Sequence, residues 1–305
     1  PEGYDVPGRQ IPLIVASQNT TSNSTGVVSA ATALLIEIQR THPNTADNFF
    51  ATLSETTKAV LLAGARHGND WTNNPITSGA NRGKTFQPID EVVGVGTVNI
   101  DRSHLIMTGG QHEALSSLTS LPIAPFAGWD TGVLSPGQSK YIRFSVATLA
   151  EEVVILTTWH QKPNSDFQSY KLVNIDLKLW SLNGEELQSL VGNSGLGIFS
   201  SGNITSESDV DNVEHLYIKG LAPGEYALEI DRIDTNSGSR VYSVGWLFPE
   251  SEAVPGDLDG DGVVGIEDLL IVISGWGSCS NCVADINKDG VVDVEDLLLV
   301  ISYWQ

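Results

Sequence analysis

Short runs of apolar and β-favouring residues recur through the middle of the chain, from about residue 127 to 248. Gly, Asn and Pro turn residues separate the runs, which lie at 141–146, 153–159, 173–180, 214–218, 225–233 and 241–248. Short strands at this spacing are typical of an antiparallel β-sandwich. Within this region Asn183-Gly184 predicts a hairpin turn, and Ala222-Pro223-Gly224 predicts a turn between two further strands.

The first 120 residues carry two helical patterns. Residues 27–38 are apolar on nearly all sides, which predicts a helix buried inside a larger domain. Residues 54–65 begin with capping-type residues and end at Gly64 and Gly68, which predicts a second, more amphipathic helix. Because few strands are predicted to surround the buried helix, we expect part of this domain to be missing from the chain.

The end of the chain alternates between acidic clusters and apolar runs. Residues 269–273 and 297–301 are strongly apolar, and each follows an acidic cluster. The segment 251–305 holds eleven carboxylates and a single cation, Lys288. A disordered acidic tail would be polar throughout, so we expect this segment to fold.

Length and composition narrow the class of protein. A chain of 305 residues and 32.6 kDa exceeds the usual size of one hydrophobic core, which predicts two or three domains. With 41% hydrophobic and 17% charged residues it is neither a disordered polyelectrolyte nor a membrane protein. The net charge of −21 opposes binding to nucleic acid or anionic lipid and suits divalent cations. The chain begins at Pro1 without Met or signal peptide, so we expect a piece of a longer protein.

The two acidic clusters form an internal repeat with an offset of 28 residues, at 257–268 and 285–296. Each has oxygen-bearing side chains at positions 1, 3 and 5, Gly at position 6 and a carboxylate at position 12. This is the pattern of EF-hand calcium loops, with Asp in place of Glu at the last position. Ca²⁺ takes about six to eight oxygen ligands, and Gly262 and Gly290 permit the sharp turn around it.

The pattern assigns one calcium ion to each loop. Position 7 supplies a backbone carbonyl, and position 9 ligates through water, from Asp293 in the second loop. Gly265 offers no side chain at that position, so we expect the first loop to bind more weakly. The predicted ligands are Asp257, Asp259, Asp261, Val263 and Asp268 in the first loop, and Asp285, Asn287, Asp289, Val291, Asp293 and Asp296 in the second.

The tandem loops, each followed by one helix, resemble a dockerin type I module over residues 255–305. The resemblance implies a small all-α domain that is folded by two Ca²⁺ ions and docks onto a cohesin-like or other cell-surface anchoring protein. At loop positions 10 and 11 this chain has Ile266-Glu267 and Val294-Glu295, where cellulosomal dockerins often have Ser-Thr for cohesin recognition.

Cys279 and Cys282, the only cysteines, lie between the two repeats. A zinc site would need two more Cys or His ligands, and the local sequence supplies none. A short disulfide and a free redox pair remain, and the secreted character of the surrounding sequence favours the disulfide.

The middle region resembles the accessory β-domain that follows the catalytic domain in many secreted bacterial peptidases, the pre-peptidase C-terminal type. The resemblance lies in segments 174–180, 211–215 and 220–226. Three acids here, Asp176, Asp211 and Glu214, are candidates for a further calcium site. Such acids are also commonly solvated or cap turns, and this interpretation is favoured.

The start of the first predicted helix resembles the active-serine segment of subtilisin-like (peptidase S8-type) serine peptidases. The matching residues are Thr21, Ser22, Ser24, Thr25, Val28, Ala31, Ala33 and Leu34. On this register the resemblance implies that Ser22 is the nucleophile. Segments 60–65 and 94–99 resemble later parts of the same domain, whereas Thr20, Gly26 and Ala30 replace the family's Gly, Pro and Gly.

A Ser or Thr at a helix start is also an ordinary N-cap, so the residues themselves leave both roles open. In subtilisin-like enzymes the triad runs Asp, His, Ser, but only 21 residues precede Ser22 and the first histidine is His42. A serine without a general base is not activated. We therefore expect this chain by itself not to hydrolyse peptides.

Together these patterns predict a multidomain protein: an α/β subtilisin-like remnant at 1–122, an antiparallel β-sandwich at 123–250, and the all-α calcium module at 255–305. The leading hypothesis is the C-terminal part of a secreted bacterial serine endopeptidase whose substrates are proteins or peptides. The alternative is a non-catalytic surface or adhesion protein, or an accessory subunit of a carbohydrate-degrading complex. In either case we expect an extracellular or cell-surface location and no membrane span.

Overall fold

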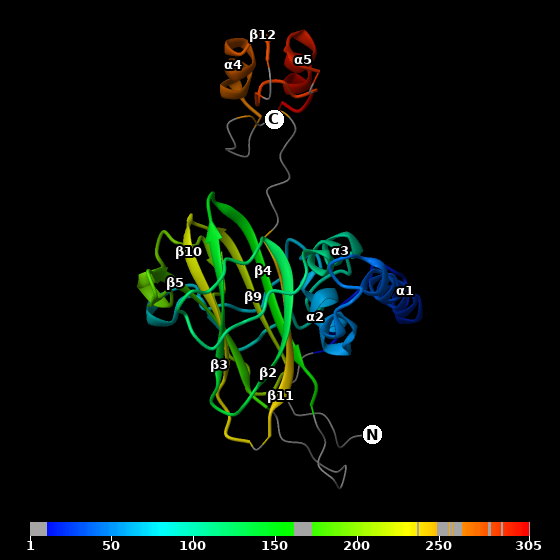
Figure 1. The fold of residues 1–305 in the computed structure, drawn as a ribbon, viewed down its shortest axis with the longest axis vertical. Helices are drawn as coiled ribbons and strands as arrows, with labels where there is room; N and C mark the ends of the chain where they lie inside the picture. The colour runs from blue at the N-terminus through cyan, green and yellow to red at the C-terminus, as the bar shows by residue number, and fades with distance from the viewer. Residues whose placement is uncertain are drawn as a thin grey trace. The chain divides into compact units, whose positions relative to one another are not determined.

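The computed structural model describes residues 11–161, 173–236, 238–248, 256, 258, 264–279, 282–287 and 289–304. The chain divides into two units, Pro1–Pro249 and Glu250–Gln305 (Figure 1). In the described part of the chain, no helix is both long enough and apolar enough to cross a membrane.

Two sheets dominate the first unit. One has five antiparallel strands, in the order β2 (Ala127–Leu134), β11 (Arg240–Leu247), β4 (Ala150–Trp159), β9 (Val213–Leu221) and β7 (Ser201–Gly202). The other has six strands, in the order β1 (Lys84–Thr85), β8 (Thr205–Ser206), β5 (Ile175–Asn183), β10 (Gly224–Arg232) and β3 (Ser139–Val146), with β6 (Glu186–Ser189) paired to β5. Among the described strand pairs of both sheets, only β1 and β8 run parallel.

The two sheets enclose a common apolar core. Alternate residues of β3, β5 and β10 meet residues of β4, β9 and β11, including the buried rings of Trp159, Tyr242 and Trp246. The turn at 222–224 carries the chain from one sheet to the other, and the Tyr226 hydroxyl donates to the Ala222 carbonyl oxygen at 2.7 Å across it. The β-rich prediction is therefore confirmed, and the two facing sheets make this region a sandwich.

Helices cover the outer face of the five-stranded sheet (Figure 1). These are α1 (Thr21–Thr41), α2 (Ser54–Ala63) and α3 (Ile100–Gly109), with short 3-10 turns at Phe49–Thr52, Gly79–Asn81 and Gly192–Gly195. A second core forms where the helices meet Trp129, Val154 and Tyr217 of the sheet. Central strand β4 is buried on both faces along 153–159, which explains why its sequence is apolar without alternation.

The expected domain boundary at 122/123 lies inside this first unit. The helices of the first 122 residues share a core with the sheet, and strand β1 extends the other sheet by pairing with β8. An apolar outer sheet face needs cover, which is why the two segments pack as one body.

The expectation of an all-round buried helix at 27–38 is wrong. Helix α1 spans Thr21–Thr41, and of its residues only Ala31, Leu35 and Gln39 are buried. These lie four residues apart and form one stripe, whereas Leu34 is 55% exposed. Helix α1 thus contacts its neighbours along one face.

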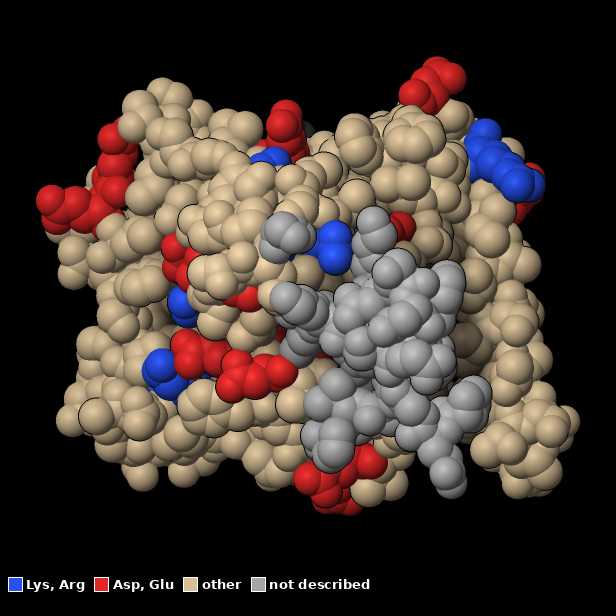
Figure 2. All heavy atoms as spheres, turned by 90° about the horizontal axis from the view of Figure 1, so that it is seen from below, with Lys and Arg blue, Asp and Glu red and all other residues tan. Residues whose placement is uncertain are grey.

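Several basic side chains of the first unit pair with carboxylates. Lys178 lies 3.1 Å from Asp231, Arg143 lies 2.9 Å from Glu225, and Arg102 lies 2.6 Å from Glu152. Figure 2 shows one face of the molecule, where acidic side chains gather in small groups, some beside a basic one.

The second unit is built from two similar halves. Helices α4 (Ile266–Ser274) and α5 (Val294–Ser302) accompany a two-stranded ladder of β12 (Gly277–Ser278) and β13 (Val291–Val292). Its small core contains equivalent residues of the two repeats, 28 positions apart: Val264 and Val292, and Val272 and Val300.

Candidate metal centre

The second acidic loop is wrapped by hydrogen bonds from its own backbone to its polar side chains. The carboxylate of Asp285 accepts from the N–H groups of Asp289 at 3.1 Å and Gly290 at 2.9 Å. The Asn287 side-chain oxygen accepts from Asp289 N–H at 3.0 Å, and the Asp289 carboxylate accepts from Val291 N–H at 2.9 Å. Gly290 turns the chain with φ +92°, a conformation that side chains with Cβ disfavour. Positions 1, 3 and 5 therefore face the inside of one turn.

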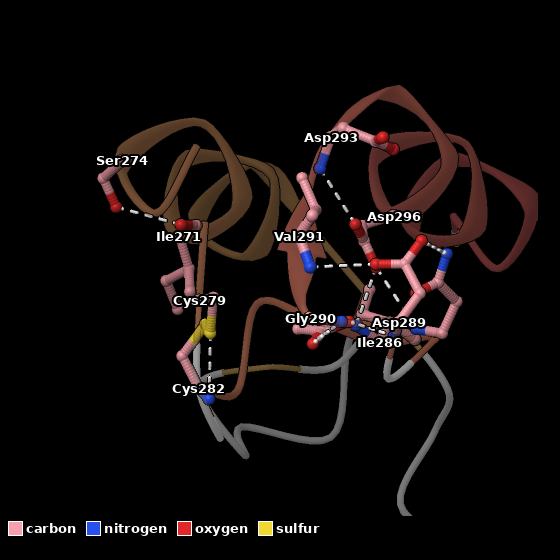
Figure 3. The surroundings of a disulfide bond; sticks show 12 residues. Ile271, Ser274, Cys279, Cys282, Ile286, Asp289, Gly290, Val291, Asp293 and Asp296 are labelled. Atoms are coloured by element: carbon pink, nitrogen blue, oxygen red, sulfur yellow. Dashed lines mark hydrogen bonds between the residues drawn. A yellow bond between two sulfur atoms is a disulfide. The ribbon is translucent and has the colours of Figure 1, made fainter. Parts of the chain in front are cut away.

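Asp296, the position-12 residue, closes this loop. Its fully buried carboxylate accepts from the N–H groups of Ile286 at 2.8 Å, Asn287 at 3.2 Å and Asp293 at 2.9 Å (Figure 3). Burial opposes its charged form, but the N–H donors of Asp293, Asn287 and Ile286 outweigh burial and lower the pKa of Asp296. It is therefore ionised at neutral pH, as a calcium ligand must be.

Asp268, the position-12 residue of the first loop, also accepts hydrogen bonds from the backbone of its own loop. It is buried, and its carboxylate accepts from the N–H groups of Leu258 at 2.6 Å and Gly265 at 2.7 Å. Both donors precede by 28 residues those that Asp296 binds, Ile286 and Asp293. The predicted ligands Asp257, Asp259, Asp261 and Val263 lie outside the described residues.

The donor set of the second loop fits a hard cation. It combines ionisable carboxylates with the amide oxygen of Asn287 and the carbonyl of Val291, and it contains no sulfur or imidazole. In the described ranges, no three His, Cys, Asp or Glu side chains are grouped as a metal site. The fit therefore rests on the wrapped loop and on the oxygen chemistry of its side chains.

A disulfide joins Cys279 and Cys282 beside this loop, as the sequence favoured (Figure 3). The N–H of Cys279 donates to the carbonyl oxygen of Gly290 at 2.9 Å, and the N–H of Asp285 donates to that of Cys282 at 3.3 Å. Both ends of the disulfide therefore contact the second loop.

The helices of this unit expose matching apolar side chains, although the apolar runs at 269–273 and 297–301 gave no indication of which residues would be exposed. Leu270 of α4 is 56% exposed and Leu298 of α5 is 57% exposed. The other pairs at the same offset are Ile266 with Val294 and Ile273 with Ile301. Spacings of four and three residues, repeated in both helices, were the signal that could have revealed these two faces.

Ser22, the candidate nucleophile, is exposed in the first turn of α1. The N-cap of this helix is Thr20, whose hydroxyl oxygen accepts from Asn23 N–H at 3.3 Å. Within the described residues, no hydrogen bond joins Ser22 to a histidine: the ring of His42 accepts from Asn44 N–H, and His67 stacks on Tyr217.

The acids of the sandwich are held by local groups. Buried Glu214 accepts from the Ser206 hydroxyl and from Ser208 N–H, while Asp211 accepts from the Ser208 hydroxyl at 2.8 Å. Burial raises the pKa of Glu214 well above its usual value and that of Asp176 to about 7. For Asp211 and Glu214 these contacts fit local capping, whereas one carboxylate oxygen of Asp176 is buried without a hydrogen-bond partner in the described part of the chain.

Comparisons with known proteins bear on the second unit. No curated protein matches the chain. Among solved structures it is similar to the periplasmic g-type lysozyme inhibitor PliG of Aeromonas hydrophila, at 7% identity over 39% of this chain and 82% of that chain, with a TM-score of 0.23. A glycoside hydrolase family 43 arabinoxylan arabinofuranohydrolase of Bacillus subtilis matches at 8% identity over 45% and 24%, with a TM-score of 0.23.

The complex of the Aeromonas sobria serine protease and its chaperone matches at 11% identity over 76% of this chain and 45% of that chain, with a TM-score of 0.20. Scores this low carry no argument about the first unit. Residues 255–305 match the family Dockerin type I domain. The wrapped second loop, the sequence repeat and this match together support a dockerin type I domain at residues 255–305.

Proposed function

We propose that residues 255–305 are a calcium-stabilised anchoring module, which attaches the rest of the protein to a cohesin-like or other cell-surface partner outside the cell. The observation that carries this proposal is the pair of buried aspartates, Asp268 and Asp296. Each accepts hydrogen bonds at equivalent backbone positions of its own loop. The family match supports the same conclusion.

Calcium would neutralise carboxylates that otherwise repel one another inside each loop. In the second loop the residues that would hold it are Asp285, Asn287, Asp289, Val291, Asp293 and Asp296. Five of these use side-chain oxygens, and Val291 would use its carbonyl. Asp296 keeps one lone pair for a cation, because a carboxylate has about four lone-pair sites and three accept N–H groups here.

The partner would dock on the apolar faces of α4 and α5. Leu270 and Leu298 are the centres of these faces, and each is more than half exposed. Because the two faces repeat the same residue types at the same spacing, either could contact the partner.

Calcium titration of the whole chain tests the metal part of this proposal. We expect isothermal calorimetry with calcium chloride to detect two sites, and Asp296→Asn to remove or strongly weaken one of them. Asp268→Asn should weaken the other, while Glu186→Gln on exposed strand β6 should change neither. A chelator should reduce the helicity of the second unit. A wild-type chain that binds no calcium would overturn the proposal.

We further propose that the first unit belongs to a subtilisin-like serine endopeptidase, with Ser22 as nucleophile and its base and carboxylate on a longer parent. The support for this is the sequence resemblance around Ser22, together with the exposed Leu34 and Val27 of α1, which further parts of a longer protein would cover. A fluorophosphonate probe should label the longer protein, and Ser22→Ala should abolish the labelling, while Ser29→Ala should not. Absent labelling would favour a non-catalytic surface or complex-accessory protein.

A further inference from the structure

The disulfide lies between two parts of the second calcium loop. Cys279 directly follows strand β12, which pairs with β13 through Gly277 with Val292 and Ser278 with Val291. The hydrogen bond from Cys279 N–H to Gly290 extends this ladder by one residue. The first cysteine is therefore fixed to loop positions 6 to 8, including the carbonyl ligand Val291.

The second cysteine is fixed to the start of the loop. The Cys282 carbonyl oxygen accepts from the N–H of Asp285, the position-1 ligand, at 3.3 Å. The Cys282 N–H in turn donates to the Cys279 sulfur at 3.1 Å. The short covalent ring therefore connects the ligand at position 1 with the strand that carries the ligand at position 7 (Figure 3).

The first loop has no equivalent connection. The positions 28 residues before the cysteines are Ser251 and Val254, so nothing covalent holds that loop. A change in the oxidation state of the cysteines should therefore act on one loop only.

We propose that the Cys279–Cys282 disulfide is a redox-dependent brace. The second loop binds calcium more tightly when the disulfide is formed than when the disulfide is reduced. The inference rests on the proposed function, because calcium is the ligand concerned. The crosslink restricts the segment before the loop, to which Gly290 and Asp285 are hydrogen-bonded, so less ordering of the loop remains when the ion binds. Two electrons and two protons from a dithiol convert the S–S bond to two thiols, and the dithiol becomes a cyclic disulfide.

Calcium titration of the full chain before and after dithiothreitol tests the brace. Removing a crosslink over such a short ring should weaken one calcium site by about tenfold and leave the other unchanged. The change should persist in Asp268→Asn, in which only the second loop binds tightly. The double variant Cys279→Ser, Cys282→Ser should match the reduced protein, and dithiothreitol should not alter it further.

The outcomes separate the two proposals. If the oxidised chain binds two ions and reduction changes the affinity of neither site, the brace is overturned and the proposed anchoring module is unaffected. If the oxidised chain binds no calcium, the proposed function itself fails. Should the double Ser variant not fold, the comparison of the wild-type chain in its two oxidation states still decides, with circular dichroism showing that the helices persist.

Discussion

At the scale of single residues, two neighbouring histidines, buried His215 and half-buried His67, make the first unit sensitive to acid. The ring of His67 stacks on Tyr217 at 3.9 Å and on His215 at 5.2 Å. Burial lowers the pKa of His215 to about 3, although the Pro88 carbonyl favours the charged form. Burial and the nearby His215, Arg102 and Lys219 lower the pKa of His67. Both rings are therefore neutral in the folded protein.

We expect this pair to destabilise the first unit as the pH falls. An unfolded histidine takes up a proton near pH 6.5, whereas the folded His215 does not until about pH 3, so the unfolded state binds more protons between these values. Stability from each ring is present above pH 6.5 and falls by about 1.4 kcal/mol per pH unit below it. Asp176 acts in the opposite direction, because its raised pKa of about 7 favours the folded state as the pH falls toward 4.

Substitution separates the histidine contribution from the carboxylate contribution. The free energy of unfolding of His215→Asn, measured with urea at pH 7, 6 and 5, should fall less on acidification than that of the wild type. The difference should be about 2 kcal/mol between pH 6.5 and pH 5. His104→Asn on the exposed side of α3 should keep the wild-type profile. Equal acid sensitivity in wild type and His215→Asn would contradict this assignment.

At the scale of elements, the contact between α2 and α3 requires a residue without a side chain. Helix α2 ends at Gly64, where a Cβ atom would lie 2.7 Å from the backbone nitrogen of Ser103 in α3. The backbone of Gly64 has ordinary helical angles, so close approach and not dihedral strain explains the glycine. Gly26 in α1 is the contrasting case, since a Cβ there would meet nothing within 4 Å.

The two glycines should respond to alanine in opposite directions. Gly64→Ala should destabilise the first unit by about 1–3 kcal/mol, because α3 must shift to admit the methyl group. Gly26→Ala should stabilise it by about 0.5–1 kcal/mol, because alanine has the higher helix propensity. Urea unfolding of both variants measures this, and a stabilising effect of Gly64→Ala would show that the helices can separate without cost.

At the scale of the whole molecule, the sequence patterns predicted the features that depend on neighbouring residues: several strands, the acidic loops and the disulfide. The runs at 141–146, 153–159 and 225–233 correspond to strands β3, β4 and β10 within a few residues. The spacing of oxygen ligands identified the acidic loops, because a cation dictates which positions carry oxygens. The disulfide was predicted from the cysteine count and the expected extracellular setting.

Features that depend on contacts between residues far apart in the chain could not be predicted from the sequence. Strand β2 includes two glycines and Asp130, which disfavour strands, yet Asp130 is held by Gln111, Ala114 and Tyr242. The two-residue strands β1 and β8 pair across more than a hundred residues of chain. The apolar pattern of α1 indicated a buried helix but not how many neighbours would reach it.

The helical cover on the five-stranded sheet has a practical consequence for anyone cutting this gene. A fragment that starts at the apparent strand boundary, near residue 123, would leave Trp129, Val154 and Tyr217 uncovered on a broad β surface. Solvent-exposed aromatic and β-branched side chains on such a surface promote self-association and the formation of inclusion bodies. An expression plasmid for the sandwich should therefore retain the three helices upstream of it.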